Sequence, residues 1–274
     1  MKISIAGELG SGKSTVSKIL IDRLGAEYYY TGAIMRAVAE SRGMSVVELS
    51  LYMESHPEID HEIDDGLRRL SDDPREMIID SRLAWHFVRD TYKVYLTVDP
   101  LSAANRIFRD NRATESAESV EAVLENIKTR RNSEKKRYRE QYGVDCKDLA
   151  NYDLVIDTTH ASPESIAELI VNGKAAHEAD RASGRGFYIC PLRLRFPDDA
   201  SDEQKVARYA AALDEGTSPD EAVEVVDFDG DFYVIGGVEA ALAYTMCDRT
   251  FVPCVYRGEQ KPEGNFVSMS DTLF

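Results

Sequence analysis

The stretch Gly7-Glu8-Leu9-Gly10-Ser11-Gly12-Lys13-Ser14-Thr15 decides the fold of this chain. It follows an apolar, β-rich run and matches the pattern G-x-x-x-x-G-K-[ST], in which a glycine-rich loop wraps the phosphates of a nucleotide. Glycine adopts φ values that a Cβ disfavours and allows a close approach, so the backbone N–H groups can turn inward. The expected phosphate-binding residues are Gly7, Gly10, Ser11, Gly12, Lys13, Ser14 and Thr15.

The helix predicted after this loop, from Lys13 to Leu24, directs the positive end of its dipole at the same anion. We expect Lys13 to reach the β- and γ-phosphates of ATP and to act in catalysis, and Ser14 to bind Mg²⁺. The run Met77–Asp80 ends in an acid where a strand would emerge beside the loop. Asp80 is therefore the second candidate for the metal site, and a turn-capping acid is the alternative. ATP and Mg²⁺ are the expected cofactors.

The first part of the chain alternates β-rich runs with helical patterns. The runs are Lys2–Ala6, Glu27–Tyr30, Met77–Asp80, Val94–Val98 and Leu154–Asp157. This alternation predicts an α/β fold, a parallel five-stranded sheet covered by helices on both faces. Two helical segments extend the pattern, an arm at about residues 33–70 and a lid at about 101–140. Residues 101–140 contain ten Lys and Arg against seven Asp and Glu, so we interpret the lid as an anion site, with a solvated face as the alternative.

Charge and apolar content exclude several classes of protein. The chain has 33 Lys and Arg against 49 Asp and Glu, a formal charge of −16, which argues against bulk nucleic-acid binding. With 43% apolar residues it is globular. No apolar run approaches the roughly 20 residues that span a bilayer, so we expect a cytoplasmic protein with no membrane partner. The four cysteines lack C-x-x-C spacing and are interpreted as reduced thiols.

A polar run from Glu178 to Gly186 has the composition of a linker and predicts two domains, 1–180 and 186–274. The second domain is predicted to mix short strands with helices, at 187–196, 202–213, 223–227, 232–235, 238–247 and 251–256. Asp229-Gly230 between two of these strands is a hairpin signal.

Residues 1–176 resemble the cytidylate kinases, especially their archaeal-type branch. Several motifs carry the resemblance in order along the chain: Ser11-Gly12-Lys13-Ser14-Thr15, Tyr30-Thr31-Gly32-Ala33-Ile34-Met35-Arg36, Pro57-Glu58-Ile59-Asp60 with Ile63-Asp64, Asp80-Ser81-Arg82-Leu83-Ala84, Arg130 and Ser133-Glu134 leading into Arg137-Tyr138, Tyr142-Gly143-Val144-Asp145, and Tyr152-Asp153-Leu154-Val155-Ile156-Asp157-Thr158.

This resemblance implies the P-loop fold of nucleoside-monophosphate kinases. It places Arg36 on the acceptor phosphate, with Thr31 and Gly32 in the same acceptor site, and Arg82 near the acceptor nucleotide. Arg130, Glu134 and Arg137 match the acceptor and lid site of that family, and Arg82, Arg130 and Arg137 join Lys13 as catalytic residues. Positions four and three apart share one helix face, so these three side chains are expected to converge; a surface ion-pair ladder is the alternative.

The stretch Phe228–Gly237 and the order of elements around it resemble the ParB/sulfiredoxin-like α+β domain. Glu239 stands where that family has a phosphate-binding cation, so the domain is expected to be degenerate and to serve regulation, a protein partner or self-association. From Arg181 onward there are 9 basic and 17 acidic residues, which agrees with this interpretation.

The expected function is ATP-dependent phosphoryl transfer to a nucleoside monophosphate, CMP or dCMP, by positioning and electrostatics without a covalent intermediate. Two alternatives remain open. One is a nucleotide-dependent switch or binding module with a degenerate regulatory C-terminal domain. The other is a kinase for a different small phosphorylated acceptor.

Overall fold

The computed structural model describes residues 1–110, 118–181, 184–198 and 201–268. They form two compact units, one of Met1–Leu154 with Pro163–Gly184 and one of Val155–Ser162 with Arg185–Phe274. The sequence places a boundary at residues 180–186, whereas the structure also groups the short segment Val155–Ser162 with the C-terminal unit. Part of the predicted lid, residues 111–117, lies outside the described residues.

Strands of the α/β part lie at the five predicted places. They are β1 (Lys2–Gly7), β2 (Glu27–Tyr30), β3 (Met77–Asp80), β4 (Thr91–Thr97) and β5 (Leu154–Asp157). β2, β3, β1 and β4 pair in that order, and all are parallel, which confirms the predicted fold class. Asp153 anchors the start of β5, because its N–H donates to the Lys93 carbonyl at 2.8 Å and its carboxylate accepts from the Lys93 N–H at 2.9 Å.

Strand β4 begins at Thr91, three residues before the predicted start. Polar side chains at Thr91 and Lys93 interrupt the apolar run, so the pattern did not reveal this part of the strand. The hydroxyls of Thr91 and Ser4 are 3.0 Å apart and hydrogen-bonded, which satisfies both buried groups between β4 and β1.

The arm consists of three helices, α2 (Thr31–Ser41), α3 (Val46–Tyr52) and α4 (Pro57–Arg69), followed by the short turn η1 (Leu70–Asp72). Ser45 begins α3 with a capping box: its hydroxyl accepts from the Glu48 N–H at 3.2 Å, and the Glu48 carboxylate accepts from the Ser45 N–H at 2.7 Å. The arm also has a small core of its own, formed by Ala39, Val46, Leu49, Met53 and Ile59.

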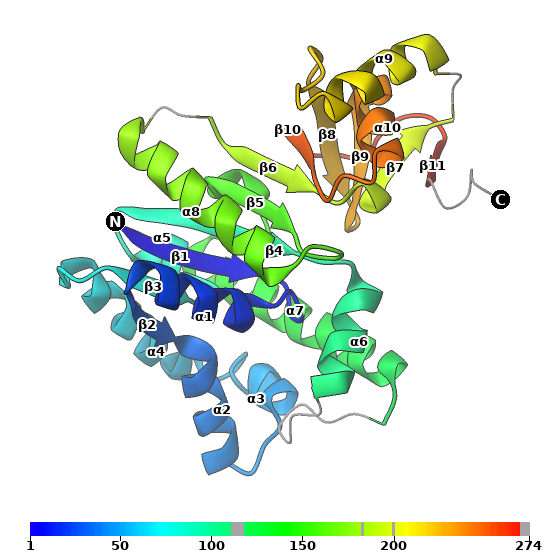
Figure 1. Cartoon of the computed structure of the whole chain (residues 1–274). Helices are drawn as coiled ribbons and strands as arrows, with labels where there is room; N and C mark the ends of the chain where they lie inside the picture. Colours follow the sequence, from blue (N-terminus) through cyan, green and yellow to red (C-terminus); the bar gives the residue numbers. More distant parts are fainter. Residues whose placement is uncertain (111–117, 182–183, 199–200, 269–274) are drawn as a thin grey trace. The chain divides into compact units, whose positions relative to one another are not determined.

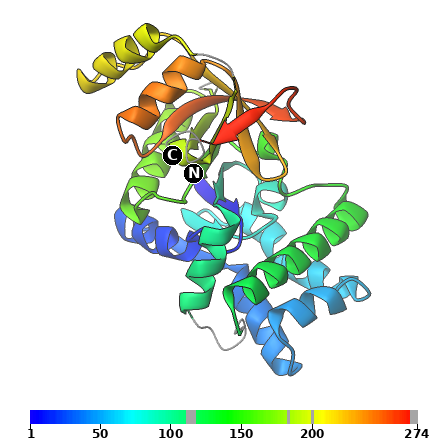
Figure 2. The same cartoon turned by 90° about the vertical axis from the view of Figure 1, so that its right-hand side faces the viewer.

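Two helices follow β4, α6 (Pro100–Asp110) and α7 (Val120–Tyr142), and the turn η2 (Leu149–Asn151) precedes β5. Figure 2 shows α7, in green, beside the blue helices of the arm. The Ser133 hydroxyl of α7 donates to the Ser50 carbonyl of α3 at 2.8 Å. At the C-terminal end of α7, the Tyr142 hydroxyl donates to the buried carboxylate of Asp64 in α4. Polar contacts therefore join the middle and the C-terminal end of α7 to the arm.

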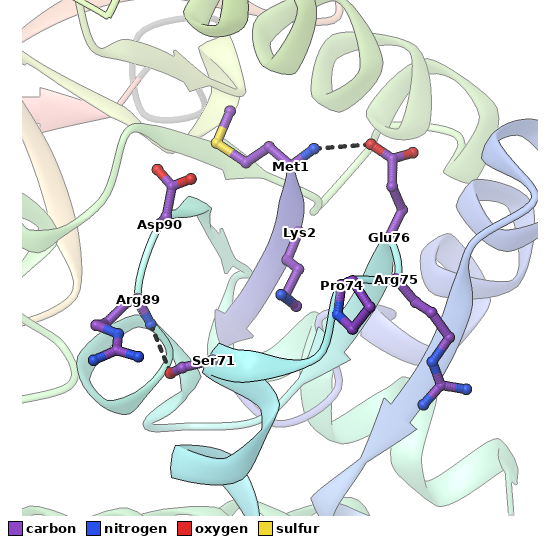
Figure 3. Close-up of a pocket in the computed structure, with 8 residues that line it drawn as sticks. All are labelled: Met1, Lys2, Ser71, Pro74, Arg75, Glu76, Arg89 and Asp90. Atoms are coloured by element: carbon purple, nitrogen blue, oxygen red, sulfur yellow. Dashed lines mark hydrogen bonds and ion pairs between the residues drawn. The ribbon is translucent and has the colours of Figure 1, made fainter.

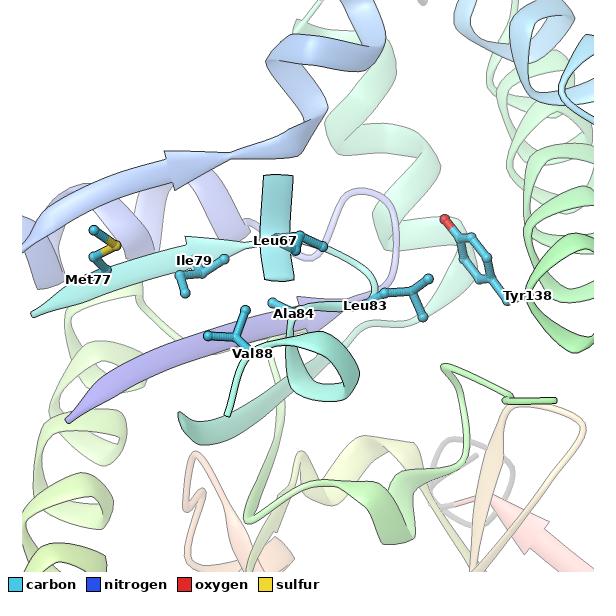
Figure 4. Close-up of a cluster of buried hydrophobic side chains, with 7 residues drawn as sticks. All are labelled: Leu67, Met77, Ile79, Leu83, Ala84, Val88 and Tyr138. Atoms are coloured by element: carbon cyan, nitrogen blue, oxygen red, sulfur yellow. The ribbon is translucent and has the colours of Figure 1, made fainter. Parts of the chain in front are cut away.

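Helices α1 (Lys13–Leu24) and α8 (Pro163–Ala179) lie side by side in front of the sheet in Figure 1. Another buried cluster packs β3 against α4, α7 and the short helix α5 (Ala84–Phe87), as Figure 4 shows. Its members are Leu67, Met77, Ile79, Leu83, Ala84, Val88 and Tyr138. Trp85 of α5 is 9% exposed, with its ring 5.7 Å from that of Tyr152, and is therefore a core residue.

The C-terminal unit mixes strands and helices, as predicted. Its elements are β6 (Gly186–Ile189), η3 (Pro191–Arg193), β7 (Leu194–Pro197), α9 (Glu203–Asp214), β8 (Val223–Phe228), β9 (Asp231–Gly236), α10 (Val238–Met246), β10 (Val252–Glu259) and β11 (Phe266–Ser268). The strands follow the order β11-β7-β9-β8-β10-β6, in which β7–β9 and β8–β10 are parallel and the other pairs antiparallel.

Two local expectations in this unit have opposite outcomes. The segment 187–196, predicted as one element, is divided, because Pro191 lacks an N–H for the ladder and the chain turns through η3 between β6 and β7. The hairpin at Asp229-Gly230 is confirmed. Both residues have positive φ, 52° and 93°, as a type I′ turn requires, and they join β8 to β9.

A buried ion pair explains why Val155–Ser162 belongs to the C-terminal unit. Asp157 is 0% exposed and accepts from the Arg193 guanidinium at 3.3 Å and from the Thr159 N–H at 2.8 Å. Arg193 also donates to the Gly230 carbonyl at 2.6 Å. One carboxylate at the end of β5 thus holds an arginine that reaches the β8–β9 hairpin.

Replacing Asp157 with Ala in the full chain should destabilise the C-terminal unit by about 3–5 kcal/mol, because it leaves the Arg193 guanidinium buried without its carboxylate. Hydrogen exchange of the β8 and β9 amides measures this loss. Arg181→Ala is the control: it breaks the exposed Arg181–Asp90 pair and should cost less than about 1 kcal/mol. Equal exchange in both variants would contradict the assigned role of Asp157.

Asp64→Asn should make the stability of the N-terminal unit less dependent on pH. Burial raises the pKa of Asp64 to about 6, above its value in an unfolded chain, so the folded state binds the extra proton and stability falls as pH rises from about 4 to 6. Relative to the parent, the variant should gain up to about 3 kcal/mol between pH 4 and pH 7.5. Urea unfolding measures the difference. Asp65→Asn, on the exposed side of α4, is the control. Parallel pH profiles for parent and Asp64→Asn would rule out the effect.

Candidate active site

The glycine-rich loop lies between the end of β1 and the start of α1. Gly7 and Gly10 have φ of 147° and 75°, which L side chains rarely adopt. A Cβ on Gly7 would lie 2.4 Å from the Leu96 carbonyl oxygen, and one on Gly10 would lie 2.7 Å from that of Ala103. Both positions therefore need glycine for conformation and for space. Gly12, with φ of 80°, is the residue before α1.

Lys13, the first residue of α1, is half-buried. Its ammonium donates to the carbonyls of Gly7 at 3.1 Å and Glu8 at 2.7 Å. Burial lowers the pKa of Lys13 to about 7, with a further contribution from the charge of Arg82. The amine is thus held within the loop, among neutral acceptors and beside other cations.

Other loop residues differ in their exposure. Ser11 is buried and donates from its hydroxyl to the Glu8 carbonyl at 2.8 Å, so it shapes the loop. Ser14 is half-buried, whereas Thr15 is exposed on α1. The Glu8 carboxylate accepts from the Val98 N–H at 3.2 Å and lies 3.7 Å from Arg131 and 3.8 Å from Lys147. Glu8, which the sequence analysis did not single out, therefore links the loop to β4 and α7.

Asp80 ends β3 and is 3% exposed. Burial raises its pKa, and the charges of Lys13 and then Arg82 act against that rise. The Ser14 hydroxyl and the Asp80 carboxylate are hard oxygen donors of the kind that Mg²⁺ prefers. Among the described residues, no group of three or more His, Cys, Asp or Glu is arranged to hold a metal. Ser14 and Asp80 fit an ion that also takes ligands from phosphates and water, as Mg²⁺ does in such sites.

Three of the predicted residues meet at one buried ion cluster, Arg82, Arg130 and Glu134. Glu134 accepts from Arg82 at 2.9 Å and from Arg130 at 3.0 Å, and Arg82 also donates to the Gly7 carbonyl. Burial favours a higher pKa for Glu134, but Arg82 and then Arg130 outweigh it and hold the pKa well below its usual range. The lid helix α7 is thereby joined to the phosphate loop.

The side chains of Arg130, Glu134 and Arg137 do not all converge as expected, because Arg137 pairs with a residue outside this set. Its guanidinium turns to the arm, where it pairs with the buried carboxylate of Asp60 in α4. Gln141, one helical turn later, donates to the same carboxylate at 3.2 Å. Proximity on one helix face did not bring all three side chains to one point, because Asp60 offers Arg137 a buried partner of its own. Arg137 stays near enough to Glu134 to contribute to its lowered pKa.

Arg36, predicted to hold the acceptor phosphate, lies on α2 and donates to the Tyr30 hydroxyl at 2.8 Å. The buried hydroxyl of Thr31 donates to the Asp80 carbonyl at 3.3 Å, which joins α2 to the end of β3. Gly32 lies against the Tyr30 ring, since a Cβ there would be 2.5 Å from it. In the lid, Arg106 of α6 donates to the Gly10 carbonyl at 3.2 Å.

A pocket at the other end of the strands is drawn in Figure 3. Its lining is Met1, Lys2, Ser71, Pro74, Arg75, Glu76, Arg89 and Asp90. Met1 precedes β1, Lys2 begins it and Glu76 precedes β3, whereas the loop follows β1 and Asp80 ends β3. The pocket therefore lies at the amino ends of the parallel strands, away from the phosphate loop.

No helix within the described ranges is both long and apolar enough to cross a membrane.

The part of the chain that contains this site is similar to known proteins. The Cytidylate kinase-like family matches residues 2–160. The cytidylate kinase of Methanothermobacter thermautotrophicus is 38% identical over 165 residues, 60% of this chain and 99% of that protein. The cytidylate kinase of Methanobrevibacter smithii is 36% identical over 171 residues, 62% of this chain and 96% of that protein.

A third relative is larger. The S-adenosylmethionine-dependent nucleotide dehydratase of Lacinutrix mariniflava is 32% identical over 200 residues, which are 71% of this chain and 41% of that protein. The family match ends at residue 160, so the resemblance of the C-terminal unit to ParB/sulfiredoxin-like domains stays a prediction. With more than half of its length matched, the chain belongs to the cytidylate kinase-like family and is a nucleoside-monophosphate kinase.

Proposed function

We propose that the chain transfers the γ-phosphoryl group of ATP to the phosphate of CMP or dCMP, giving ADP and the nucleoside diphosphate. The observation that carries this proposal is the contact of Arg82 with both Glu134 of the lid helix and the Gly7 carbonyl of the phosphate loop. Through this contact, cations from three parts of the chain lie around one loop: Lys13 of the loop itself, Arg82 after β3 and Arg130 of α7. The names of the archaeal relatives support cytidine as the base.

On the donor side, Lys13 exchanges its carbonyl partners for the β- and γ-phosphates, while the loop N–H groups and the α1 dipole hold the same anion. Ser14 and Asp80 are the residues that would hold Mg²⁺, which would neutralise charge on the phosphates. Arg82 and Arg130 spread charge over the migrating group, because preorganised cations in a dry site stabilise developing negative charge.

On the acceptor side, Arg36 binds the monophosphate with its guanidinium, a planar donor suited to phosphate. Thr31 and Gly32 set the start of α2 beside Asp80. Glu134 orients Arg82 and Arg130, since each of its two oxygens accepts from one of these guanidinium groups. Arg137 positions α7 on the arm through Asp60.

The proposed role of the C-terminal unit is regulation or a protein contact. Glu239, at the start of α10, pairs with Lys205 at 3.1 Å and accepts from the Asp202 N–H at 3.5 Å. These contacts support the expectation that Glu239 does not bind phosphate, because its carboxylate is held by Lys205 and would repel an anion. A nucleotide-dependent switch, the second candidate, would bind ATP without turnover of any acceptor.

A coupled ADP-release assay over the common ribo- and deoxyribonucleoside monophosphates tests this proposal. CMP and dCMP should have the highest kcat/KM. Preference for another monophosphate would overturn the assignment of the base, and no acceptor-dependent ADP release would favour the switch.

Lys13→Ala should lower kcat by 10²-fold or more, because it removes the cation that neutralises charge on the β- and γ-phosphates. Since Lys13 is half-buried, circular dichroism accompanies the assay to show that the fold is kept. Lys18→Ala, on the exposed side of the same helix, is the matched control and should keep parental turnover. Parental turnover in Lys13→Ala would refute the role of Lys13.

Arg36→Ala should raise the KM for the acceptor about 10- to 100-fold and leave the KM for ATP nearly unchanged, since a charge-assisted hydrogen bond contributes about 1.5–3 kcal/mol. Steady-state kinetics with each substrate varied in turn measures both constants. Arg42→Ala, in the exposed residue that follows α2, is the control. Equal effects on both constants would remove Arg36 from the acceptor site.

A further inference from the structure

Strand β2 carries three consecutive tyrosines, of which Tyr28 and Tyr30 share one face because side chains alternate along a strand. Their rings are stacked, with centroids 5.8 Å apart and planes 18° apart. Tyr29 is on the other face and packs against the buried cluster of β3, α4, α5 and α7. Hydrophobic packing explains why Tyr29 is a tyrosine-sized residue, but it does not explain the hydroxyl groups of the stacked Tyr28 and Tyr30 rings.

At one end of the stack, Tyr30 holds the acceptor-side arginine. Its hydroxyl accepts from Arg36 at 2.8 Å, and the Arg36 guanidinium carbon lies 5.0 Å from the Tyr30 ring centroid. The contact with Gly32 makes room for this ring, since any Cβ there would overlap it. Arg36 uses one of its five N–H donors on Tyr30, which leaves the others for a phosphate.

At the other end, Tyr28 contacts the donor-side carboxylate. Its hydroxyl donates to Asp80 at 3.4 Å, and Asp80 is close enough to Lys13 for each to shift the pKa of the other. In the strand register Tyr30 lies opposite Asp80, so the stack begins at the point where the donor and acceptor halves meet.

We propose that Tyr28 and Tyr30 are positioning residues of the phosphoryl transfer, Tyr30 fixing the Arg36 guanidinium and Tyr28 fixing the Asp80 carboxylate, with their stacked rings setting the spacing between acceptor and donor groups. This rests on the proposed function. A long arginine side chain loses considerable rotamer freedom when it binds a phosphate, and a hydroxyl that holds it beforehand reduces that loss.

Tyr30→Phe tests the acceptor end, because it keeps the ring and the stack and removes only the hydroxyl. The KM for CMP should rise about two- to tenfold, the effect of one ordinary hydrogen bond, while kcat and the KM for ATP change little. In an Arg36→Ala background the same substitution should have no further effect. Additive effects of the two substitutions would overturn the assignment of Tyr30.

Tyr28→Phe tests the donor end and should raise the Mg²⁺ concentration needed for half-maximal turnover without changing the KM for CMP. Tyr29→Phe is the matched control on the opposite face of β2 and should keep parental constants. Equal changes in all three variants would mean that the tyrosines act only through the stability of the strand.

A spectroscopic readout separates this inference from the choice of substrate. In ¹⁵N NMR of the full chain, the Arg36 Nε–H signal should lose order in Tyr30→Phe and keep it in Tyr29→Phe. Absence of CMP phosphorylation by the parent protein would overturn the proposed function alone. An Arg36 signal equally ordered in parent and Tyr30→Phe would overturn the positioning role, whatever the acceptor.

Discussion

Glu134 is 6% exposed, and its two carboxylate oxygens accept from arginines of different segments, Arg82 after β3 and Arg130 within α7. Arg82 continues to the Gly7 carbonyl, so one buried acid ties the lid helix to the phosphate loop. Such an acid is costly to bury unless every charge has a partner. The geometry of the loop therefore depends on the helix, and a displacement of α7 would leave charges unpaired at the centre of the site.

Positive charge gathers around Glu134 in the N-terminal unit, although the chain as a whole is acidic. Arg82 and Arg130 are close enough to Lys13 for their charges to help lower its pKa, in a chain with a formal charge of −16. Arg82 and Arg130 share the Glu134 carboxylate, and Lys13 donates to the carbonyls of Gly7 and Glu8. The two arginines are therefore held in place before an anion arrives, and such preorganised charge stabilises the anion with little reorganisation.

The strands and most helices could be predicted because alternation and the loop motif are local signals. The break at Pro191 was missed because a 3-10 turn interrupts an otherwise strand-like segment. The early start of β4 was missed because its first residues include polar side chains. In the site, the loop motif predicted Lys13, the end of a strand predicted Asp80, and the family resemblance predicted Arg82. None of these signals could show that Arg137 turns to Asp60, since that carboxylate lies 77 positions away in the sequence. For Tyr28 and Tyr30 the sequence predicted only that they lie in a strand, because the strand pattern does not show which hydroxyl groups face an active site.

Trp85, a residue of α5 that packs against Tyr152, is the only tryptophan in the sequence. Its emission reports on the N-terminal unit alone, because the C-terminal unit contains tyrosine and phenylalanine but no indole. Unfolding followed by tryptophan fluorescence and by far-ultraviolet circular dichroism would coincide only if the two units unfold together. Trp85 is thus an intrinsic fluorescent probe that distinguishes unfolding of the N-terminal unit from unfolding of the C-terminal unit.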